Sequence, residues 1–405
     1  MSYNQPKSYF LLLLLFVITG FAQAQTIPVD LQQGDRVVFV GDGLFENELD
    51  YGHFEYALTT AWPDRHITFR NIGWSGDTPA GTSRDHFTNP PTAHDHLIEQ
   101  IKATKPTVAF VGYGAHMAFE DRSVLEDFKT DLIALLDSLE VMEVEVVLLS
   151  PAPQEPETSP APSVNEHNQM LLAVSKQIGA IAKDRSYPFI DLMESLLPSA
   201  NDPQVHISDN GLQLNDRGYA IAAGVLAKHL KYDDPEKGFL EKDLAIDVKK
   251  GKVSSEISDF TLEDKAIAFT FTPEAMPAPV TSDATVDFET PRLRVAGLRR
   301  GNHSLWMGNK KMATASAKDW ARGVSFSSPL GAQATQLQEL IYKKNRTYFY
   351  QYRPQNETYL VGFREYEQGN NARELQLLEP IIGEMENRIG RLRIPRDVSL
   401  KLVAD

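Results

Sequence analysis

Arg36-Val37-Val38-Phe39-Val40 runs directly into Gly41-Asp42-Gly43, and this stretch decides the fold. An apolar run of β-branched and aromatic residues without polar alternation is typical of a strand buried on both faces of a parallel sheet. The two glycines around Asp42 predict a tight turn at its carboxyl end. Four further runs of the same kind follow, and together they predict strands at 36–41, 67–72, 107–112, 145–150 and 188–192.

Amphipathic segments separate these runs and predict helices at 51–61, 92–103, 124–139, 163–182 and 215–230. Strands and helices that alternate in this way predict an α/β domain with a doubly wound parallel sheet and right-handed crossovers. In such folds the ligand crevice lies at the carboxyl ends of the strands. We therefore expect a crevice where 41–43, 73–77 and 112–116 meet, with the proline-rich loop 151–162 along its rim.

The distal half of the chain has a different pattern. Turn sequences at 298–301 and 308–310 predict hairpins in a small β-sandwich-like module, with strands at 266–271, 292–295, 304–307 and 323–326. Helical patterns follow at 332–349 and 375–392, and Pro380 either kinks the second helix or lies at its start. The chain thus divides into a signal peptide (1–24), an α/β domain (25–235), a β module (236–330) and a helical C-terminal segment packing on the α/β domain (331–405).

The N-terminal residues are typical of a secretory signal. Lys7 precedes the apolar stretch 10–21, and Ala22-Gln23-Ala24 has the A-x-A cleavage pattern. We expect cleavage, export to the periplasm or the medium, and no membrane insertion afterwards.

The absence of cysteine excludes disulfides and thiolate metal sites. A net charge of −15 argues against nucleic acid as a partner.

Four blocks of the α/β domain carry a family resemblance. They are 40–43 (Val-Gly-Asp-Gly), 71–78 (Asn-Ile-Gly-Trp-Ser-Gly-Asp-Thr), 113–116 (Tyr-Gly-Ala-His) and 209–216 (Asp-Asn-Gly-Leu-Gln-Leu-Asn-Asp). In this order and spacing, the segment 34–230 resembles the SGNH/GDSL hydrolase superfamily. The resemblance implies a flavodoxin-like fold with a serine nucleophile in the first block. It also implies oxyanion donors from that serine's amide, a glycine and an asparagine, and a histidine base with an aspartate three residues before it.

At most of the catalytic positions that the resemblance implies, this sequence has a different residue type. Gly43 stands at the nucleophile, Gln213 at the base and Asn210 at the aspartate. His116 stands at the oxyanion asparagine, and the oxyanion glycine alone is retained, as Gly76. A glutamine side chain accepts no proton at a useful pH, and loss of the nucleophile or the base typically costs on the order of 10⁶ in turnover.

Three other arrangements would support chemistry. In the first, Ser75 is a displaced nucleophile, the alternative being a turn residue whose hydroxyl bonds the backbone. In the second, His116 is a general base for water assisted by Asp42 or Asp77, the alternative being a hydrogen-bonded wall residue. In the third, Asp42, Asp77, His116 and His206 hold a hard metal ion, although their spacing follows no metal motif. We therefore expect neither a metal nor another cofactor, and we expect Asp42 to accept backbone amides.

The predicted ligand crevice consists of Asp42, Gly43, Trp74, Asp77, Arg84 and His116. Trp74 would stack on a sugar face, the alternative being a packed tryptophan beside an ion pair inside the domain. Phe119 is expected in the core. The aromatic segment 348–372 resembles the one that closes exported chains of the same superfamily. It either packs on the α/β domain and shapes a crevice wall or forms a carbohydrate platform.

These observations lead to three hypotheses about function. The first is an exported SGNH/GDSL-like protein, impaired in serine-hydrolase chemistry, whose crevice binds a saccharide or an acylated small molecule. The second is an active ester hydrolase that acts on carbohydrate-linked acyl groups from a nonstandard site around His116. The third is a scaffold whose C-terminal part binds another exported protein. The fold is that of an esterase, but the catalytic residue types are missing, so the sequence leaves enzymatic activity open.

Overall fold

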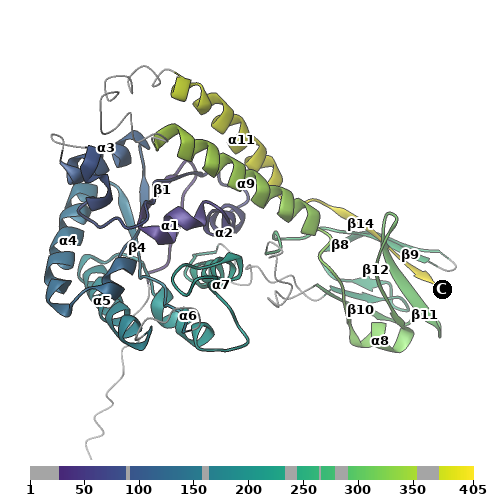
Figure 1. Ribbon diagram of the computed structural model, residues 1–405. Coiled ribbons are helices and arrows are strands. Elements are labelled where there is room, and N and C mark those ends of the chain that lie inside the picture. Colours follow the sequence, from purple (N-terminus) through teal and green to yellow (C-terminus); the bar gives the residue numbers. More distant parts are fainter. Residues whose placement is uncertain are drawn as a thin grey trace, which may run out of the picture.

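The computed structural model describes residues 27–87, 92–156, 164–232, 244–263, 266–278, 291–353 and 374–405. Figure 1 shows an α/β domain and a β module, with two long helices running between them. The predicted signal peptide and residues 157–162 of the proline-rich loop lie outside the described ranges. None of the helices in those ranges combines the length and the apolarity that a membrane crossing requires.

The α/β domain is built on one parallel sheet of five strands in the order β2-β1-β3-β4-β5. This is the strand order of flavodoxin-like doubly wound folds, so the predicted fold class is confirmed. Each predicted strand is present. The strands are β1 (Arg36–Gly41), β2 (Thr68–Asn71), β3 (Val108–Gly112), β4 (Glu145–Leu149) and β5 (Phe189–Ile190).

The residues of β1 alternate between two hydrophobic cores. Val37 and Phe39 pack into one core, and Val38 and Val40 pack into the other. This is why the strand is apolar at every position, since neither face of the sheet meets water. The carboxyl end of β1 lies beside that of β3, where Gly41 pairs with Gly112, and the candidate site forms at this edge.

The predicted helices are also present, as α2 (His53–Ala61), α3 (Ala93–Ala103), α4 (Leu125–Val141), α5 (Val164–Arg185) and α7 (Asp216–Ala227). Asn215 caps α7 as expected, because its side chain accepts a hydrogen bond from the Gly218 amide. Two further helices, α1 (Gly43–Glu48) and α6 (Leu192–Ala200), are not predicted from the sequence. The first is too short to show a helical period, and the second contains Pro198. Short 3₁₀ helices cover Thr82–Phe87 (η1), Ala115–Phe119 (η2) and Arg122–Val124 (η3).

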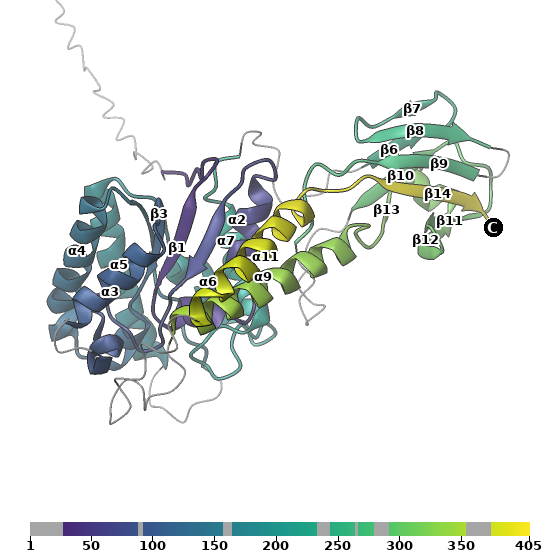
Figure 2. The same ribbon diagram turned by 90° about the horizontal axis from the view of Figure 1, so that it is seen from above.

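The β module consists of two sheets that enclose a core of their own. The smaller sheet has the order β13-β10-β6-β7 and the larger one β12-β11-β14-β9-β8 (Figure 2). The elements are β6 (Leu244–Asp247), β7 (Lys252–Val253), β8 (Ile257–Leu262), β9 (Ala266–Phe271), β10 (Arg292–Ala296), β11 (Asn302–Met307), β12 (Lys310–Ser316), α8 (Ala317–Arg322), β13 (Val324–Ser325) and β14 (Val398–Ala404).

Two expectations about the distal half need correction. Residues 331–405 are not helical throughout, because the last strand β14 lies between β11 and β9 in the larger sheet. The turn at 298–301 is not a hairpin, because it joins β10 of the smaller sheet to β11 of the larger one. The turn at 308–310 is a hairpin as predicted, since Met307 pairs with Lys310 in antiparallel strands.

Two long helices, α9 (Gly331–Tyr352) and α11 (Leu378–Leu392), pack on the α/β domain. Lys344 of α9 is fully buried; its Nζ lies 2.8 Å from Glu55 Oε2 of α2 and donates to the carbonyl oxygen of Phe69 at 3.0 Å. Tyr348 and Ile382 join the core of the α/β domain. The helix α11 begins at Leu378, so Pro380 lies in its first turn, where a proline causes no kink.

Candidate functional site

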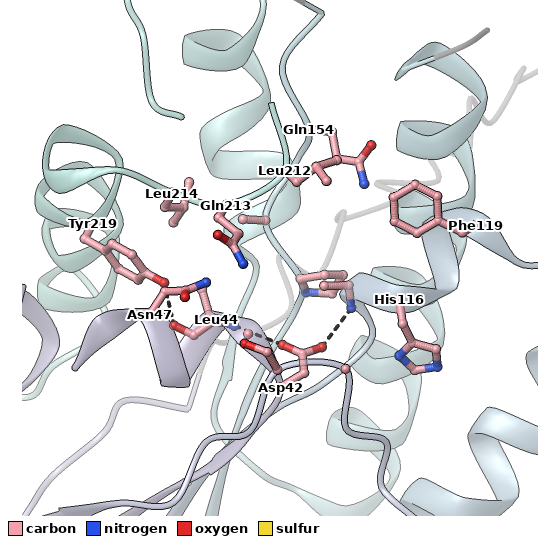
Figure 3. Close-up of a pocket in the computed structure, with 16 residues that line it drawn as sticks. Asp42, Leu44, Asn47, His116, Phe119, Gln154, Leu212, Gln213, Leu214 and Tyr219 are labelled. Atoms are coloured by element: carbon pink, nitrogen blue, oxygen red, sulfur yellow. Dashed lines mark hydrogen bonds between the residues drawn. The ribbon is translucent and has the colours of Figure 1, made fainter. Parts of the chain in front are cut away.

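A cavity of about 250 Å³ opens at the carboxyl ends of β1 and β3 (Figure 3). Most of the side chains around it are apolar or neutral amides. Its lining residues are Asp42, Gly43, Leu44, Asn47, Ser75, Gly76, Ala115, His116, Phe119, Pro151, Ala152, Gln154, Leu212, Gln213, Leu214 and Tyr219. The cavity therefore brings all four family-like blocks and the start of the proline-rich loop to one place.

Asp42 lies at the floor of the cavity and has a structural role. Its buried carboxylate accepts hydrogen bonds from the amides of Leu44 at 3.1 Å, Gly114 at 3.0 Å and Ala115 at 2.9 Å. Burial raises the pKa of Asp42, while these amides act in the opposite direction. The carboxylate thus caps α1 and ties the turn after β1 to the turn after β3, as the sequence analysis expected.

Gly43 leaves an open position at the start of α1. A Cβ atom at this residue would lie 3.5 Å from Ser75 Oγ and 3.6 Å from Asn47 Nδ2, which are ordinary contacts. The backbone of Gly43 is also outside the left-handed region that favours glycine. Neither space nor conformation therefore requires glycine at the position where the family carries its nucleophile.

Gly76 also lines the cavity, in a turn where its φ is +77°. Its turn is fixed by two amides: that of Asp77 donates to the Trp74 carbonyl oxygen at 3.0 Å, and that of Ser75 donates to Glu46 Oε2 at 2.6 Å. Within the described residues, the amides of Gly43 and Gly76 donate no hydrogen bond. Two backbone donors therefore remain available to an oxygen atom of a ligand.

Asn210 and Gln213 form a side-chain pair where the family has aspartate and histidine. Asn210 Oδ1 accepts from the amides of Leu212 at 3.0 Å and Gln213 at 2.9 Å, and Asn210 Nδ2 donates to Gln213 Oε1 at 3.2 Å. Gln213 thereby projects into the cavity (Figure 3). Asp209 does not replace the aspartate, because its carboxylate accepts from Asn215 Nδ2 at 3.0 Å. The loop geometry holds an amide pair, which cannot carry a proton away from a nucleophile.

Glu155 anchors this loop and was not identified from the sequence. Its carboxylate is buried and accepts from the amides of Ile207 at 2.7 Å and Ser208 at 3.1 Å. Its own amide donates to the carbonyl oxygen of Gly211 at 3.0 Å. The first described part of the proline-rich loop is therefore bonded to the loop that carries Gln213. A glutamate inside a proline-rich stretch gave no signal for this long-range contact.

His116 lies on the cavity wall in η2, but it is not paired with a carboxylate. Its Nδ1 atom is buried and has no hydrogen-bond partner in the described part of the chain. Burial lowers the pKa of His116, while Asp42 and Glu120 act in the opposite direction. The imidazole is consequently neutral at neutral pH. Since both oxygen atoms of Asp42 accept backbone amides, the predicted assistance from Asp42 is not formed.

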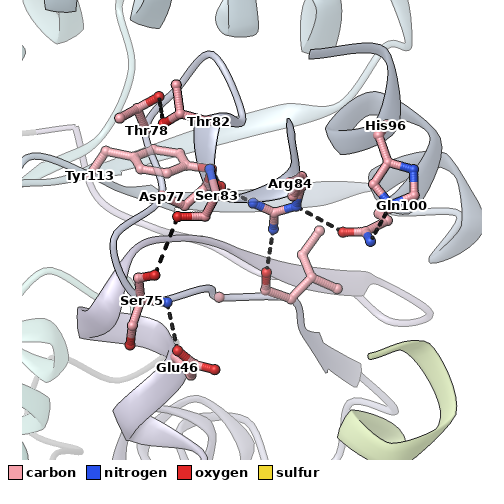
Figure 4. A network of polar contacts seen from close by, with 12 residues as sticks. Glu46, Ser75, Asp77, Thr78, Thr82, Ser83, Arg84, His96, Gln100 and Tyr113 are labelled. Carbon is pink, nitrogen blue, oxygen red and sulfur yellow. Dashed lines mark hydrogen bonds and ion pairs between the residues drawn. The ribbon is translucent and has the colours of Figure 1, made fainter. Parts of the chain in front are cut away.

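Trp74, Asp77 and Arg84, expected in the crevice, are buried and do not line the cavity. Asp77 and Arg84 lie in a polar network (Figure 4), and the Arg84 guanidinium lies 5.0 Å from the ring centre of Trp74. Asp77 forms an ion pair with Arg84 and accepts from the Tyr113 hydroxyl at 3.2 Å and the Ser83 amide at 3.0 Å. Arg84 also donates to the carbonyl oxygen of Ile72 at 2.8 Å. The expectation for these three residues is therefore corrected, because protein groups already occupy their polar atoms and Trp74 is covered.

The end of α9 covers Trp74 and braces the turn that contains Gly76. The guanidinium of Arg353 lies 3.3 Å from the ring centre of Trp74 and 2.8 Å from Glu46 Oε1. Glu46 in turn accepts from the Ser75 amide, and the Tyr352 hydroxyl donates to the Gly73 carbonyl oxygen at 3.2 Å. The described part of the aromatic segment thus supports a crevice wall; residues 354–372 lie outside the described ranges.

Phe119 and Leu212 form an apolar rim at the mouth of the cavity. Phe119 is 59% exposed and Leu212 is 49% exposed. Phe119 was expected in the core, and this was wrong, because η2 ends at this residue and turns its ring toward His167, 4.8 Å away. An exposed phenyl ring beside a cavity is a surface on which a ligand can pack.

The other two arrangements considered from the sequence are not assembled. Asp77 is held in its ion pair, and no group of three His, Asp or Glu side chains within the described ranges is placed to bind a metal ion. Ser75 lies on the wall beside Gly43, but its amide is held by Glu46 and its carbonyl oxygen accepts from Ser83 Oγ at 3.4 Å. Ser75 is thus a turn residue in this structure.

The sheet order and the crevice at the carboxyl strand ends define a flavodoxin-like α/β protein. Residues 39–221 match the model of the GDSL-like lipase/acylhydrolase family. The α/β domain therefore carries a GDSL-like lipase/acylhydrolase segment, as the sequence blocks indicated.

Among the similar solved structures, one with a TM-score above 0.5 shows the same overall fold. A gut microbial diltiazem-metabolizing enzyme superposes with a TM-score of 0.70 at 17% identity, over 94% of this chain and 100% of that one. A catalytic mutant of an acetylxylan esterase from Geobacillus stearothermophilus matches 51% of this chain and 98% of its own, with 15% identity and a TM-score of 0.39. A lipolytic G-D-S-L family protein from Veillonella parvula matches 48% and 96%, with 15% identity and a TM-score of 0.38. The search among curated proteins gives no match.

Proposed function

We propose that this protein binds a neutral acylated ligand, such as an acyl-bearing saccharide, in its crevice and releases it unchanged. The observation that carries the proposal is that Gly43 and Gln213 line the same cavity at the positions where the family has its nucleophile and its base. An acyl carbon needs a nucleophile to form a covalent intermediate, and a serine hydroxyl would need a base to lose its proton. Neither chemical group is present at these two positions.

The cavity lining supports a neutral ligand. Asp42 is the one carboxylate among the lining residues, and backbone amides already engage it. A carbonyl oxygen of the ligand would accept from the amides of Gly43 and Gly76. Asn47 Nδ2 is buried without a partner in the described part of the chain and would donate a further hydrogen bond. The apolar portion of the ligand would pack on the rim of Phe119 and Leu212.

The test is binding measured together with turnover. Purified mature protein is titrated calorimetrically with acetylated oligosaccharides, and the released acetate is followed by NMR in the same samples. We expect saturable binding without acetate release. Phe119→Ala should weaken binding, whereas Tyr342→Ala, at an exposed aromatic residue of the helix α9 that does not line the cavity, should not. Acetate release above background from the unmodified protein would reject the proposal.

A second candidate function is ester hydrolysis by His116. The observation that favours it is the buried, unpartnered Nδ1 atom of a neutral imidazole on the cavity wall. In this mechanism the imidazole takes a proton from a water molecule while the water oxygen attacks the acyl carbon. The alkoxide then leaves and the proton returns to it. Turnover that disappears in His116→Ala would favour this candidate over binding alone.

Export is part of the same proposal and rests on the pattern at 7–24. The expected mature protein begins at Gln25. Expression of the full chain in a bacterial host, followed by intact-mass measurement of the periplasmic fraction and the medium, tests this cleavage. Recovery of the uncleaved chain in the cytoplasm alone would contradict it.

A further inference from the structure

A second cavity lies at one end of the β module, separate from the crevice. It measures about 580 Å³ and lies between the two sheets. Val248 follows β6 of the smaller sheet, whereas Ile267 and Leu402 belong to β9 and β14 of the larger sheet. Ligand cavities in proteins typically measure about 300 to 1,000 Å³. Nothing in the proposed crevice function uses this second cavity.

The interior of this cavity is aliphatic. Ile267 and Leu402 are buried beneath it, and Leu298 flanks it. No phenylalanine, tyrosine or tryptophan is among the described lining residues, so there is no aromatic platform for a sugar ring. An aliphatic body of a ligand would fit these side chains better than a saccharide.

His303 supplies a polar group inside the cavity. It is 5% exposed, and its Nδ1 atom has no hydrogen-bond partner in the ranges that the structure describes. Its backbone is fixed, because it pairs with Ala404 of β14 and its carbonyl oxygen accepts from Trp320 Nε1 at 3.0 Å. A buried polar atom without a partner is unfavourable, so a ligand atom that bonds to Nδ1 would remove this penalty.

Arg300 supplies a cation at the mouth. Its loop is bounded by Gly297 and Gly301, whose φ angles of +88° and +129° favour glycine. Arg300 forms no ion pair within the described part of the chain. The carboxylates beside it are engaged, since Asp405 accepts from Ser304 Oγ at 2.7 Å and Glu263 lies 3.8 Å from Lys401. Among the lining side chains that the structure describes, the Arg300 guanidinium and His303 Nδ1 are therefore donors that a ligand can engage.

We propose that this cavity binds a small aliphatic carboxylate. The hydrocarbon chain packs on Ile267 and Leu402, and the carboxylate accepts hydrogen bonds from the Arg300 guanidinium and from Nδ1 of His303. The combination of an apolar interior with a guanidinium donor selects an amphipathic anion over a neutral alcohol of the same length. This site is independent of the crevice and of any chemistry there.

Calorimetric titration of the mature full-length protein with octanoate tests the proposal, with octanol as the uncharged probe. We expect saturable octanoate binding at one site per chain. Arg300→Ala should weaken it about tenfold, the loss expected for one charge-assisted hydrogen bond. Octanol affinity should be the same in both proteins. Arg294→Ala is the matched control, because Arg294 is an exposed arginine of β10 that does not line the cavity.

Two further variants keep the test decisive. His303→Leu should also weaken octanoate binding; if this buried substitution prevents folding, the exposed Arg300 still carries the test. Phe119→Ala changes the crevice and should leave octanoate affinity unchanged. The proposal is overturned if octanoate does not bind saturably, if Arg300→Ala binds it as tightly as the unmodified protein, or if Phe119→Ala removes the binding.

Discussion

Restoring three side chains should convert the crevice into an esterase site. The perturbation is Gly43→Ser with Asn210→Asp and Gln213→His. A Cβ at residue 43 makes contacts of 3.5 and 3.6 Å, and the Asn210–Gln213 side chains already lie 3.2 Å apart. The new side chains should therefore fit at these three positions without a change in the backbone. Serine is also a better helix former than glycine by roughly 0.5 kcal/mol, so the fold should tolerate the change.

The size of the gain follows from what remains missing. A complete set of serine, histidine and aspartate raises the turnover rate by a factor on the order of 10⁶. Because His116 stands in place of the oxyanion asparagine, this factor is divided by about 10² to 10³. The turnover rate of the triple variant should therefore exceed that of the parent protein by a factor of about 10³ to 10⁴. Adding His116→Asn should raise turnover further.

The assay is hydrolysis of p-nitrophenyl acetate, followed from the first turnover. The matched control carries Gly43→Ala with the same two other substitutions, so that it differs by one hydroxyl oxygen. Activity of the serine variant should rise with pH as the new imidazole loses its proton near its ordinary pKa of about 6.5. A folded triple variant that is no faster than its alanine control would refute the assignment of the blocks.

Three further predictions concern stability, each measured by urea unfolding. Glu155→Ala should destabilise the protein by about 3 kcal/mol, because the amides of Ile207 and Ser208 lose their buried acceptor; an unchanged midpoint would contradict this. Lys344→Met should lower the free energy of unfolding by roughly 3 to 5 kcal/mol, because it leaves Glu55 buried and without its cation. Adding Glu55→Gln should restore much of this free energy. A double variant that is no more stable than Lys344→Met would argue against the ion pair. Burial raises the pKa of Glu48 well above its usual range, so its contribution to stability is full below about pH 4.3 and is lost as pH rises toward the folded-state pKa. Glu48→Gln should therefore gain stability relative to the parent as pH rises from about 4 to 8, and parallel pH profiles would count against this.

The α/β fold could be predicted because its strands are local signals. The strands β1, β3 and β4 are short apolar runs buried on both faces, and the alternation with helices indicates the class. The place of β14 in the fold could not be predicted in the same way. Its residues alternate between apolar and polar, but its neighbours β9 and β11 are far away in the sequence. Pairing over such distances is decided by tertiary packing.

The candidate site was predicted only in part, for a similar reason. Gly43, Gly76 and Gln213 follow from blocks of sequence with fixed spacing, and the structure brings them to one cavity. Trp74 was placed wrongly because it is covered by Arg353, the residue that follows the distal helix α9. Glu155 was missed because its partners lie on a separate loop. Contacts of this kind leave no local pattern in the sequence.

The proposed function requires that no residue in the crevice of the natural protein forms a covalent bond with an acyl carbon. Intact-mass measurement after incubation with a serine-directed fluorophosphonate tests it most directly. The unmodified protein should remain unlabelled, while the Gly43→Ser triple variant should gain one adduct. Stoichiometric labelling of the unmodified protein at a crevice residue, Ser75 above all, would contradict the account.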